Sequence, residues 1–488
     1  MMMERLNPPM TTASTQPVRS APVLCVDLDG TLISTDMLWE SVVLLLKQSP
    51  LSLFLLPIWL IRGRAYLKRQ LALRVKIRPE TLPYRSEVVD YLRAQKASGR
   101  TLVLATASDE LVANSIAEHL GIFDRVLASD GVSNLKGATK ARRLAKEFGE
   151  KRFSYAGDSG SDAAVWQSAA SAIVVGSTSA AGNTEIEQRF NTPSFSPLLM
   201  IKALRLHHWS KNLLLVLPVL LAHRLEPALL LRVGLGIVLF GVAASSIYVL
   251  NDLLDLTSDR AHPWKRRRPF ASGVLSIPVG LMMFVVLLAG SLVSVWVLLG
   301  GKAALLTFGY CVLSLAYSFA LKRIVLLDVF VLTGFYSLRL LVGAAIASVP
   351  LSPWFLAFSS FFFFSLALAK RYSELLHAHD LVRDGNSGRS YGHGDRELLS
   401  LMGVSSAFSA IIILALYTQS AAVTALYNRP SILMLVCPLV LYWTSRIWLK
   451  AHRGELNEDP VTLAMRDPVS YLVGAAALFV VVLAYFLR

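Results

Sequence analysis

The chain has 488 residues, of which 54% are hydrophobic, and its formal net charge is +15. The length predicts about two or three domains, and the apolar fraction excludes an ordinary soluble enzyme, because part of such a chain must lie in lipid. A basic excess is typical of proteins that bind nucleic acid or the anionic inner face of a membrane, and here the long apolar runs favour the membrane, with no nucleic-acid partner.

Residues 1–20 are polar and rich in Pro, Thr and Ser, and they lack the apolar core of a signal peptide. We expect them to form a disordered tail that stays in the cytoplasm. The three cysteines, Cys25, Cys311 and Cys437, lie in apolar contexts and show no paired spacing. That pattern indicates neither a disulfide framework nor a zinc site.

Residues 22–26 are a short apolar run, which is typical of a buried parallel strand. The run leads into Asp27, Asp29 and Gly30. Two carboxylates and a turn glycine at the carboxyl end of a strand lie where open α/β sheets bind ligands. An acidic surface turn would give the same local pattern, so the interpretation depends on the later motifs of the chain.

Three further features come next, in order. A second apolar strand ends in Thr106, whose hydroxyl can hold a phosphate oxygen. Lys136 can supply positive charge to the same phosphate. A third apolar strand then leads into a second acidic pair, Asp158 and Asp162, again at the end of a strand.

In this order, the four pieces resemble the haloacid dehalogenase (HAD) superfamily of phosphatases, over roughly residues 21–175. The resemblance implies an α/β Rossmann-like domain in which Asp27 is the nucleophile that forms an aspartyl phosphate and Asp29 is the general acid and base. All the catalytic positions are filled, so we expect an active phosphatase. The binding residues that the resemblance implies are Thr106 and Lys136 for the phosphate, and Asp27 and Asp158, with Asp162 in support, for Mg²⁺.

An insert at about residues 38–82, where HAD enzymes place a cap over the active site, is unusually apolar. Its stretch 51–61 is interrupted only by Ser52 and Pro57, and it is shorter than the ~20 residues that span a bilayer. Two interpretations stay open here. The stretch is a buried cap helix, or it lies on the membrane beside basic residues, so that the phosphatase handles a lipid-linked phosphate.

Residues 176–199 are rich in Ser, Thr, Ala, Gly and Asn, which is typical of a linker. After it, residues 200–488 contain about nine apolar runs long enough to cross a bilayer, although His223 and Arg224 cut the first one short. We therefore expect an all-α polytopic membrane bundle. The predicted spans lie near residues 211–223, 227–250, 276–299, 303–320, 324–347, 352–369, 401–425, 430–447 and 470–487.

Lysine and arginine are concentrated in alternate loops, near residues 251–275, 320–324, 370–400 and 448–469. By the positive-inside rule, these loops face the cytoplasm. We therefore predict a multi-pass protein of the cytoplasmic (inner) membrane, with the HAD domain and the active-site loops on the cytoplasmic side.

The loop after the second predicted span begins with Asn251, Asp252, Asp255 and Asp259. On a helix, spacings of three and four put side chains on one face, so these four can converge on one point. Carboxylates so close together repel one another unless a cation lies among them, and hard oxygen ligands suit Mg²⁺. The stretch therefore predicts a site for a Mg²⁺-bound polyphosphate.

This acidic motif, together with the tail from His262 to Pro269, resembles the UbiA superfamily of intramembrane prenyltransferases. Two basic segments, residues 209–212 and 317–323, are weaker evidence for the same resemblance, which covers residues 200–488. The resemblance implies a nine-helix UbiA-like bundle whose site is open to the cytoplasmic side.

Most members of that superfamily carry a second acidic motif, DxxxD, after the sixth span. Here that loop begins with Lys370, Arg371 and Tyr372, and we interpret the later pair Asp380 and Asp384 as a chance match in a polar loop. The basic segment is more similar to one branch of the superfamily, the decaprenyl-phosphate phosphoribosyltransferases, whose donor is phosphoribosyl diphosphate.

That branch implies cations for the phosphates of donor and acceptor and carboxylates for a Mg²⁺-bound diphosphate. Topology alone explains part of the basic set, because any cytoplasmic loop is rich in Lys and Arg. Arg339 differs, since a charge within a span is costly and is a candidate for function; Glu374 is either its partner or a structural cap. The implied residues are Asn251, Asp252, Asp255 and Asp259 for catalysis, the three aspartates also for metal, and Lys211, Lys265, Arg267, Lys322, Arg339, Lys370, Arg371, Tyr372 and Glu374 for substrate.

Together, the two halves predict a bifunctional membrane enzyme. One half would transfer 5-phosphoribose from phosphoribosyl diphosphate to a polyprenyl phosphate, and the other would remove the 5-phosphate of the product. One alternative is the transfer of a prenyl group from its diphosphate to an aromatic or other acceptor, with both acidic motifs in use. A second alternative is a membrane lipid-binding or transport protein with a regulatory phosphatase domain.

Overall fold

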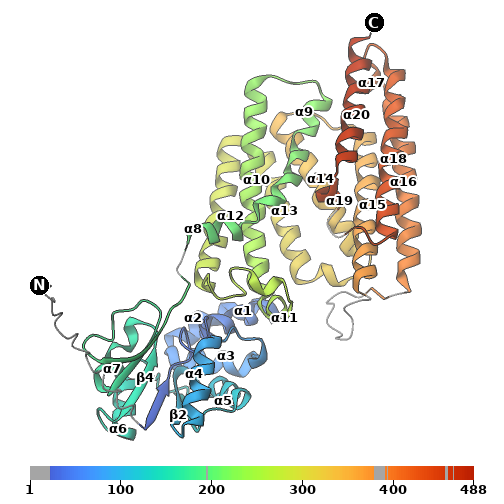
Figure 1. Cartoon of the computed structure of the whole chain (residues 1–488). Coiled ribbons are helices and arrows are strands. Elements are labelled where there is room, and N and C mark those ends of the chain that lie inside the picture. Colours follow the sequence, from blue (N-terminus) through green and yellow to red (C-terminus); the bar gives the residue numbers. More distant parts are fainter. Residues whose placement is uncertain are drawn as a thin grey trace, which may run out of the picture. The chain divides into compact units, whose positions relative to one another are not determined.

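The computed structural model describes residues 22–193, 196–378, 391–392, 394–456, 460–464 and 466–487. The chain divides into two compact units. We call the first the α/β unit; it contains the chain up to Ser196 together with the segment Asp252–Pro278. The second, the helical unit, contains Pro197–Asn251 and the chain from Val279 onward (Figure 1).

The α/β unit is built on a six-stranded sheet with the order β3-β2-β1-β4-β5-β6. All neighbouring strands are parallel, and the order reverses between β1 and β4, which is the switch point where an open sheet forms its ligand crevice. The predicted α/β fold is thus confirmed. The strands are β1 (Val23–Val26), β2 (Thr101–Asp109), β3 (Arg125–Ser129), β4 (Phe153–Gly157), β5 (Ser171–Val175) and β6 (Glu185–Phe190).

Alternating side chains of the strands form two separate cores, one on each face of the sheet. Leu24 and Val26 face the core that includes helices α4 (Ser86–Ala97) and α5 (Glu110–Leu120). Cys25, between them, faces the other core, which includes α6 (Ala138–Phe148) and α7 (Ala163–Ser168). Because both faces are covered, β1 is apolar throughout and its neighbours β2 and β4 are mainly apolar, as is typical of buried parallel strands.

Strand β6 lies inside the stretch that the composition predicts to be a linker. It pairs only with β5, at the edge of the sheet, and most of its residues are exposed. Its charged and polar residues are typical of an edge strand, and only Phe190 reaches the core. A strand with so few buried side chains lacks the apolar run by which β1 is found.

The predicted cap insert lies between β1 and β2 and is helical. A small core of its own holds it together around Leu45, Trp59, Leu67 and Leu71. Its elements are α1 (Met37–Gln48), the 3₁₀ helix η1 (Pro50–Leu55), α2 (Leu56–Ile61), α3 (Arg64–Arg74) and η2 (Pro79–Thr81).

Among the described residues, eight helices are long and apolar enough to cross a membrane. Neighbours in sequence pack together in this unit: α13 against α14, α14 against α15, and α15 against α16. The helices are α10 (Pro227–Leu254), α12 (Ile277–Leu299), α13 (Gly301–Phe319), α14 (Leu327–Ala347), α15 (Pro353–Ala378), α16 (Asp395–Thr418), α18 (Val436–His452) extended by η7 (Pro430–Leu435), and α20 (Pro468–Phe486). Short elements complete the chain: η3 (Gly160–Asp162), α11 (Leu256–Ala261), η5 (Lys265–Arg267), η6 (Leu321–Arg323), α17 (Ala421–Thr424) and α19 (Pro460–Ala464).

The first of the nine predicted spans, near residues 211–223, is not one long helix. The region consists of α8 (Pro197–Ala203), η4 (Leu206–Leu215) and α9 (Leu217–Leu221). Arg205 has a positive φ of 52°, which ends α8, and Pro218 cannot donate a backbone hydrogen bond to continue η4. The other eight predicted spans correspond to the eight long helices.

A close approach of backbones fixes η4 against α14 in the helical unit. A Cβ atom on Gly343 would lie 2.2 Å from the carbonyl oxygen of Leu215, and a backbone atom cannot turn aside as a side chain can. We expect Gly343→Ala to destabilise the helical unit by about 1–3 kcal/mol and to lower the thermal unfolding midpoint in detergent. Gly309→Ala in α13 is the control, since nothing lies within 4 Å of its added Cβ. Equal midpoints for the two variants would contradict this packing.

Candidate functional site

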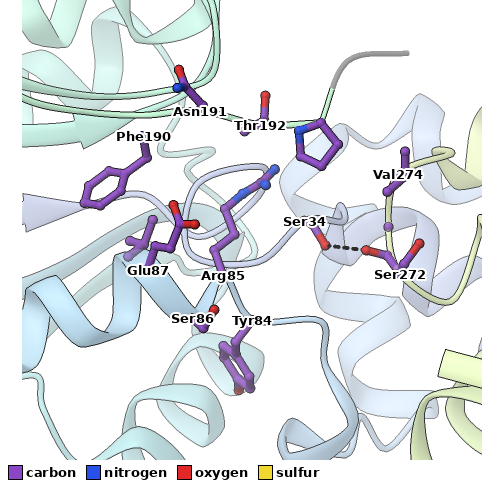
Figure 2. Close-up of a pocket in the computed structure, with 13 residues that line it drawn as sticks. Ser34, Tyr84, Arg85, Ser86, Glu87, Phe190, Asn191, Thr192, Ser272 and Val274 are labelled. Atoms are coloured by element: carbon purple, nitrogen blue, oxygen red, sulfur yellow. Dashed lines mark hydrogen bonds between the residues drawn. The ribbon is translucent and has the colours of Figure 1, made fainter. Parts of the chain in front are cut away.

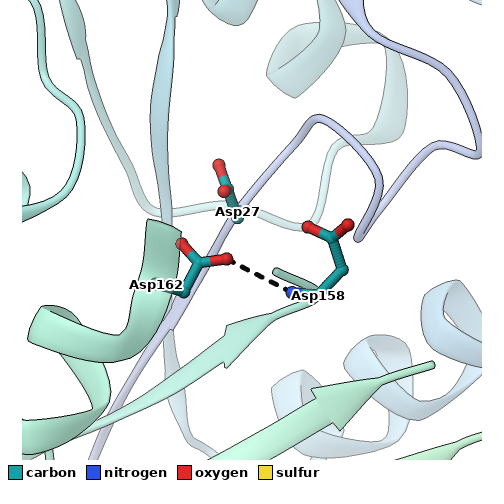
Figure 3. A group of neighbouring side chains, drawn as sticks. All are labelled: Asp27, Asp158 and Asp162. Atoms are coloured by element: carbon teal, nitrogen blue, oxygen red, sulfur yellow. Dashed lines mark hydrogen bonds between the residues drawn. The ribbon is translucent and has the colours of Figure 1, made fainter. Parts of the chain in front are cut away.

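Three carboxylates meet at the switch point of the sheet. Asp27 directly follows β1 and Asp158 directly follows the neighbouring strand β4. Asp162 ends η3, and one oxygen from each of the three side chains lies within 4.8 Å of the others (Figure 3). Within the described parts of the chain, this is the one group of three such side chains close enough to share a metal ion.

The chemistry of this group fits Mg²⁺. Carboxylate oxygens are the hard ligands that Mg²⁺ prefers. Burial raises the pKa of Asp158 to about 7, with the charges of Asp162 and Asp27 adding to the effect, and burial also raises the pKa of Asp27. A divalent cation would relieve this crowding. Asp162 accepts hydrogen bonds from the Tyr155 hydroxyl (2.8 Å) and the Asp158 N–H (3.3 Å), which suits the supporting role expected for it.

Asp29 lies beside this group and is held from two sides. Its carboxylate accepts hydrogen bonds from the backbone N–H of Met37, at the start of α1, and from the hydroxyl of Ser108, both at 2.8 Å. Burial, with the nearby charges of Asp36 and Asp27, raises the pKa of Asp29 to about 7. Near neutral pH, both protonation states are therefore accessible, as a general acid and base requires.

Lys140 is a residue of this site that the sequence analysis missed. Its Nζ lies 3.0 Å from Asp27 Oδ1, donates a hydrogen bond of 2.7 Å to the Tyr155 hydroxyl and lies 3.8 Å from Asp162. Lys136, the predicted phosphate ligand, is exposed and lines the same pocket. The signal was available, because Lys140 precedes the buried Leu144 by one turn of α6 and so lies on its buried face.

Thr106 is fully buried within β2, three residues before its end, and its hydroxyl oxygen accepts a hydrogen bond of 3.0 Å from the Ser108 N–H. Gly30 shapes the turn that follows Asp29. Its φ is +76°, and a Cβ there would lie 2.3 Å from a carboxylate oxygen of Asp158. Only glycine lets the turn approach the carboxylate this closely.

A pocket of 870 Å³ opens over these residues. One side of its lining is polar and contains Asp27, Asp29, Lys140 and Asp158. Lys68 of α3 reaches it from the cap, where burial lowers its pKa and its Nζ donates a hydrogen bond of 2.5 Å to the Ala107 carbonyl. The cap side of the lining is mainly apolar and includes Leu38, Trp39, Val42, Leu56, Leu60 and Leu67.

A second pocket of the α/β unit, of 380 Å³, lies beside the start of α4. Arg85 points into it (Figure 2), and its Nε donates a hydrogen bond of 3.0 Å to the Gly30 carbonyl. Ser34 Oγ donates one of 3.1 Å to the carbonyl of Ser272 across the pocket. Arg85 thus supports the turn that carries the first acidic motif.

The acidic stretch of the segment Asp252–Pro278 is arranged differently from the prediction of one helical face. The helix breaks at Asp255, between α10 and α11. Asp252 and Asp259 are both buried and accept hydrogen bonds from Arg268 Nη1 at 3.2 Å and 2.6 Å, while Asp255 lies 3.5 Å from Lys47 Nζ. In this conformation the three carboxylates do not form one metal site, and that they hold Mg²⁺ stays a prediction.

The helical unit has a pocket of 210 Å³ that brings together four of the predicted residues, Lys211, Asn251, Arg339 and Lys370. Arg339 is buried and donates hydrogen bonds to Asn212 Oδ1 (3.2 Å), the Tyr310 hydroxyl (3.1 Å) and the Phe335 carbonyl (2.7 Å). Two residues that line the pocket, Asn251 and His208, each have a buried polar atom, Oδ1 and Nδ1, without a hydrogen-bond partner among the described residues. Such atoms indicate that a polar ligand belongs in the pocket.

Other predicted residues do not line this pocket. Arg371 is closed in by Asp328 Oδ2 (2.5 Å), the Tyr317 hydroxyl (2.8 Å) and Glu374, so the partner of Glu374 is Arg371 and not Arg339. Tyr372 shares a hydrogen bond of 3.0 Å with His452. Lys265 and Arg267 are exposed in η5, and Lys322 is half-buried in η6. Asp380 and Asp384 lie outside the described residues.

Comparison with known proteins agrees with this division. A family model for the UbiA prenyltransferase family matches residues 213–466, and one for haloacid dehalogenase-like hydrolases matches residues 24–166. An uncharacterized protein of Sinorhizobium fredii, y4nM, is 39% identical over 94% of this chain and 90% of its own length.

Two relatives with more informative names match parts of the chain. Nodulation protein NoeC of Azorhizobium caulinodans is 39% identical over 54% of this chain and 86% of its own length. Decaprenyl-phosphate phosphoribosyltransferase of Mycolicibacterium smegmatis is 38% identical over 36% of this chain and 57% of its own length. From the long match to the first family model, the chain belongs to the UbiA prenyltransferase family, and it carries a haloacid dehalogenase-like hydrolase domain before the membrane helices.

Proposed function

We propose that the protein is a Mg²⁺-dependent bifunctional enzyme of the cytoplasmic membrane. The helical unit transfers 5-phosphoribose from phosphoribosyl diphosphate to a polyprenyl phosphate, and the α/β unit removes the 5-phosphate of the lipid-linked product. The observation that carries the proposal is the two-sided pocket of the α/β unit, in which Asp27 and Lys140 face an apolar wall from the cap. A phosphate ester attached to a long apolar chain matches both sides.

In the hydrolytic step, Asp27 attacks the phosphorus atom, an aspartyl phosphate forms, and the bond from phosphorus to the 5-oxygen breaks. Protonated Asp29 gives its proton to the departing oxygen and then takes one from the water that hydrolyses the aspartyl phosphate. Lys140, 3.0 Å from Asp27, opposes the effect of burial on the pKa of this carboxyl group and offsets negative charge on the phosphoryl group. Mg²⁺, when bound by Asp27 and Asp158, supplies further positive charge at the phosphate.

In the transfer step, the bond from ribose C1 to the diphosphate breaks, and a bond from C1 to an oxygen of the lipid phosphate forms. Diphosphate leaves with the bonding electron pair. Lys211, Arg339 and Lys370 line the pocket of the helical unit and supply positive charge for phosphate groups, while the unpartnered Asn251 Oδ1 can accept a hydrogen bond from a ribose hydroxyl. The similarity to decaprenyl-phosphate phosphoribosyltransferase supports this donor.

The family description also favours a second candidate, the transfer of a prenyl group from its diphosphate. The two functions differ in the compound that supplies the diphosphate. Purified protein in lipid nanodiscs, given Mg²⁺ and polyprenyl phosphate, should release diphosphate from phosphoribosyl diphosphate. Release only from a polyprenyl diphosphate, in the presence of an aromatic acceptor, would establish the second candidate.

We expect Asp27→Asn to separate the two steps. The variant should still make lipid-linked phosphoribose but should release no inorganic phosphate from it, because the amide cannot form an aspartyl phosphate. Mass spectrometry of the extracted lipid should show the product with its 5-phosphate retained. If the wild type and the variant give the same lipid, the α/β unit does not act on the transferase product.

The two neighbouring lysines of the phosphatase pocket should differ in effect. Lys140→Met should lower kcat by about a hundredfold or more, because it removes the cation that contacts Asp27. Lys136→Met should mainly raise KM, since Lys136 lines the pocket but is exposed to solvent. Hydrolysis of a small soluble phosphate ester measures both, with the thermal midpoint as a check on folding. Comparable kcat values for the two variants would contradict a larger catalytic role for Lys140 than for Lys136.

Two adjacent residues in the C-terminal half of α15 provide a matched test of the transferase. Lys370→Met should raise the KM for phosphoribosyl diphosphate by about tenfold at unchanged thermal stability, because Lys370 lines the pocket. Arg371→Met should instead lower the thermal midpoint, because it leaves Asp328 buried without its cation. A selective KM effect of Arg371→Met would show that Arg371 binds substrate after all.

A further inference from the structure

The cap of the α/β unit carries an apolar surface that its own core does not cover. We call it the cap surface and define it by Leu51, Phe54, Ile58, Leu60 and Ile61. Leu51 and Phe54 are each 78% exposed and Ile61 is 86% exposed. Apolar side chains exposed together over two consecutive elements, η1 and α2, are typical of a surface that meets another apolar phase.

The orientation of this surface is fixed by one aromatic side chain. Trp59 is 5% exposed and packs into the small core of the cap with Leu67 and Leu71. The guanidinium of Arg74 lies over its ring at 4.5 Å. Because Trp59 anchors one side of α2 to the cap, Ile58 and Ile61 are left on the outer side.

The same short helix forms the rim of the phosphatase pocket. Leu56, Pro57 and Leu60 of α2 line that pocket, and Leu60 is also 51% exposed. The apolar lining of the pocket is therefore continuous with the cap surface. An apolar chain lying against the cap surface could reach the pocket over Leu60, which belongs to both.

We infer that the cap surface lies in the interfacial region of the lipid bilayer, and that lipid-linked phosphates enter the pocket sideways over α2. The apolar run Pro50–Ile61 is too short to span a membrane. It is followed by the exposed Arg62 and Arg64, whose charges match the phosphates of lipid headgroups. The same chain carries eight helices that are long and apolar enough to cross a membrane, so the cap is covalently tethered to a unit that lies in a bilayer.

The membrane contact does not depend on the reaction, whereas the entry route rests on the proposed phosphatase function. Two separate measurements can therefore be made on the full-length protein in nanodiscs that contain anionic lipid. The first measurement tests whether lipid covers the cap surface. The second tests whether that contact lowers the KM for a lipid-linked phosphate.

For the first measurement, a single cysteine at Phe54→Cys carries an environment-sensitive fluorophore. The native cysteines, Cys25, Cys311 and Cys437, are all buried and react slowly with the label. We expect blue-shifted emission that is quenched by nitroxide-labelled lipid. The matched control is Leu111→Cys on α5, an exposed apolar residue outside the cap surface, which should report water.

A water-like signal at position 54 would overturn the inference. A signal shielded from water but not quenched by the lipid nitroxide would also overturn it, because protein would then cover the surface, either a second copy or this chain's own helices. Quenching by lipid, without any hydrolysis of lipid phosphates by the wild type, would leave the membrane contact standing and remove the proposed phosphatase function.

For the second measurement, Phe54→Glu and Ile61→Glu are combined. Neither residue lines the pocket, and both are exposed, so the fold should tolerate the change. We expect KM for a lipid-linked phosphate in nanodiscs to rise about tenfold, because two carboxylates oppose contact with the anionic lipid, and kcat for a small soluble phosphate ester to stay the same. An unchanged KM for the lipid substrate would exclude entry over the cap surface.

Discussion

Charge that is held out of water must be compensated within a few ångströms, and this constraint governs both units of the protein. In the α/β unit, the ammonium group of Lys140 serves two carboxylates, at 3.0 Å from Asp27 and 3.8 Å from Asp162. In the helical unit, the buried Arg371 is paired with the buried Asp328 at 2.5 Å. Asp27 and Lys140 line an open pocket, whereas Arg371 and Asp328 line none of the pockets described above.

That difference separates groups that hold the fold together from groups that can act on a ligand. Arg371 has carboxylate partners, Asp328 and Glu374, so its charge is already satisfied. The hydrogen-bond acceptors described for Arg339 are an amide, a hydroxyl and a carbonyl, all of them neutral. A buried cation with neutral partners is stabilised by any anion that enters the pocket beside it. An anionic substrate, as proposed, would therefore complete the electrostatics of the helical unit, just as a cation would complete those of the three carboxylates at the carboxyl ends of the strands.

Sequence patterns identified the parts of these sites that depend on regular structure. Asp27 and Asp158 could be placed together because each ends an apolar strand, and the ends of neighbouring parallel strands meet at one edge. Sequence patterns did not predict which of two neighbouring cationic side chains is buried, because that depends on the orientation of a helix. Lys140 lies one turn after Lys136, and the start of α6 determines that Lys140 is the buried lysine. Arg371 directly follows Lys370, and the position of Asp328, far away in sequence, determines that Arg371 is the buried cation. Strand β6 was missed for a related reason, since an edge strand needs few apolar residues.

The proposed reaction sequence places a further demand on the phosphatase, because its substrate would carry a charged sugar phosphate and a long apolar chain. Such a molecule stays in the bilayer and reaches a partner enzyme only by lateral diffusion. Tethering the two units in one chain raises the local concentration of each product at the next site without any new contact. The apolar wall of the α/β pocket then adds binding energy remote from the reacting phosphate, which an enzyme can use to position the ester against Asp27. A soluble sugar phosphate has no apolar chain to pack against the apolar residues of the cap. These residues would therefore favour binding of the lipid-linked ester over the soluble phosphates of the cell.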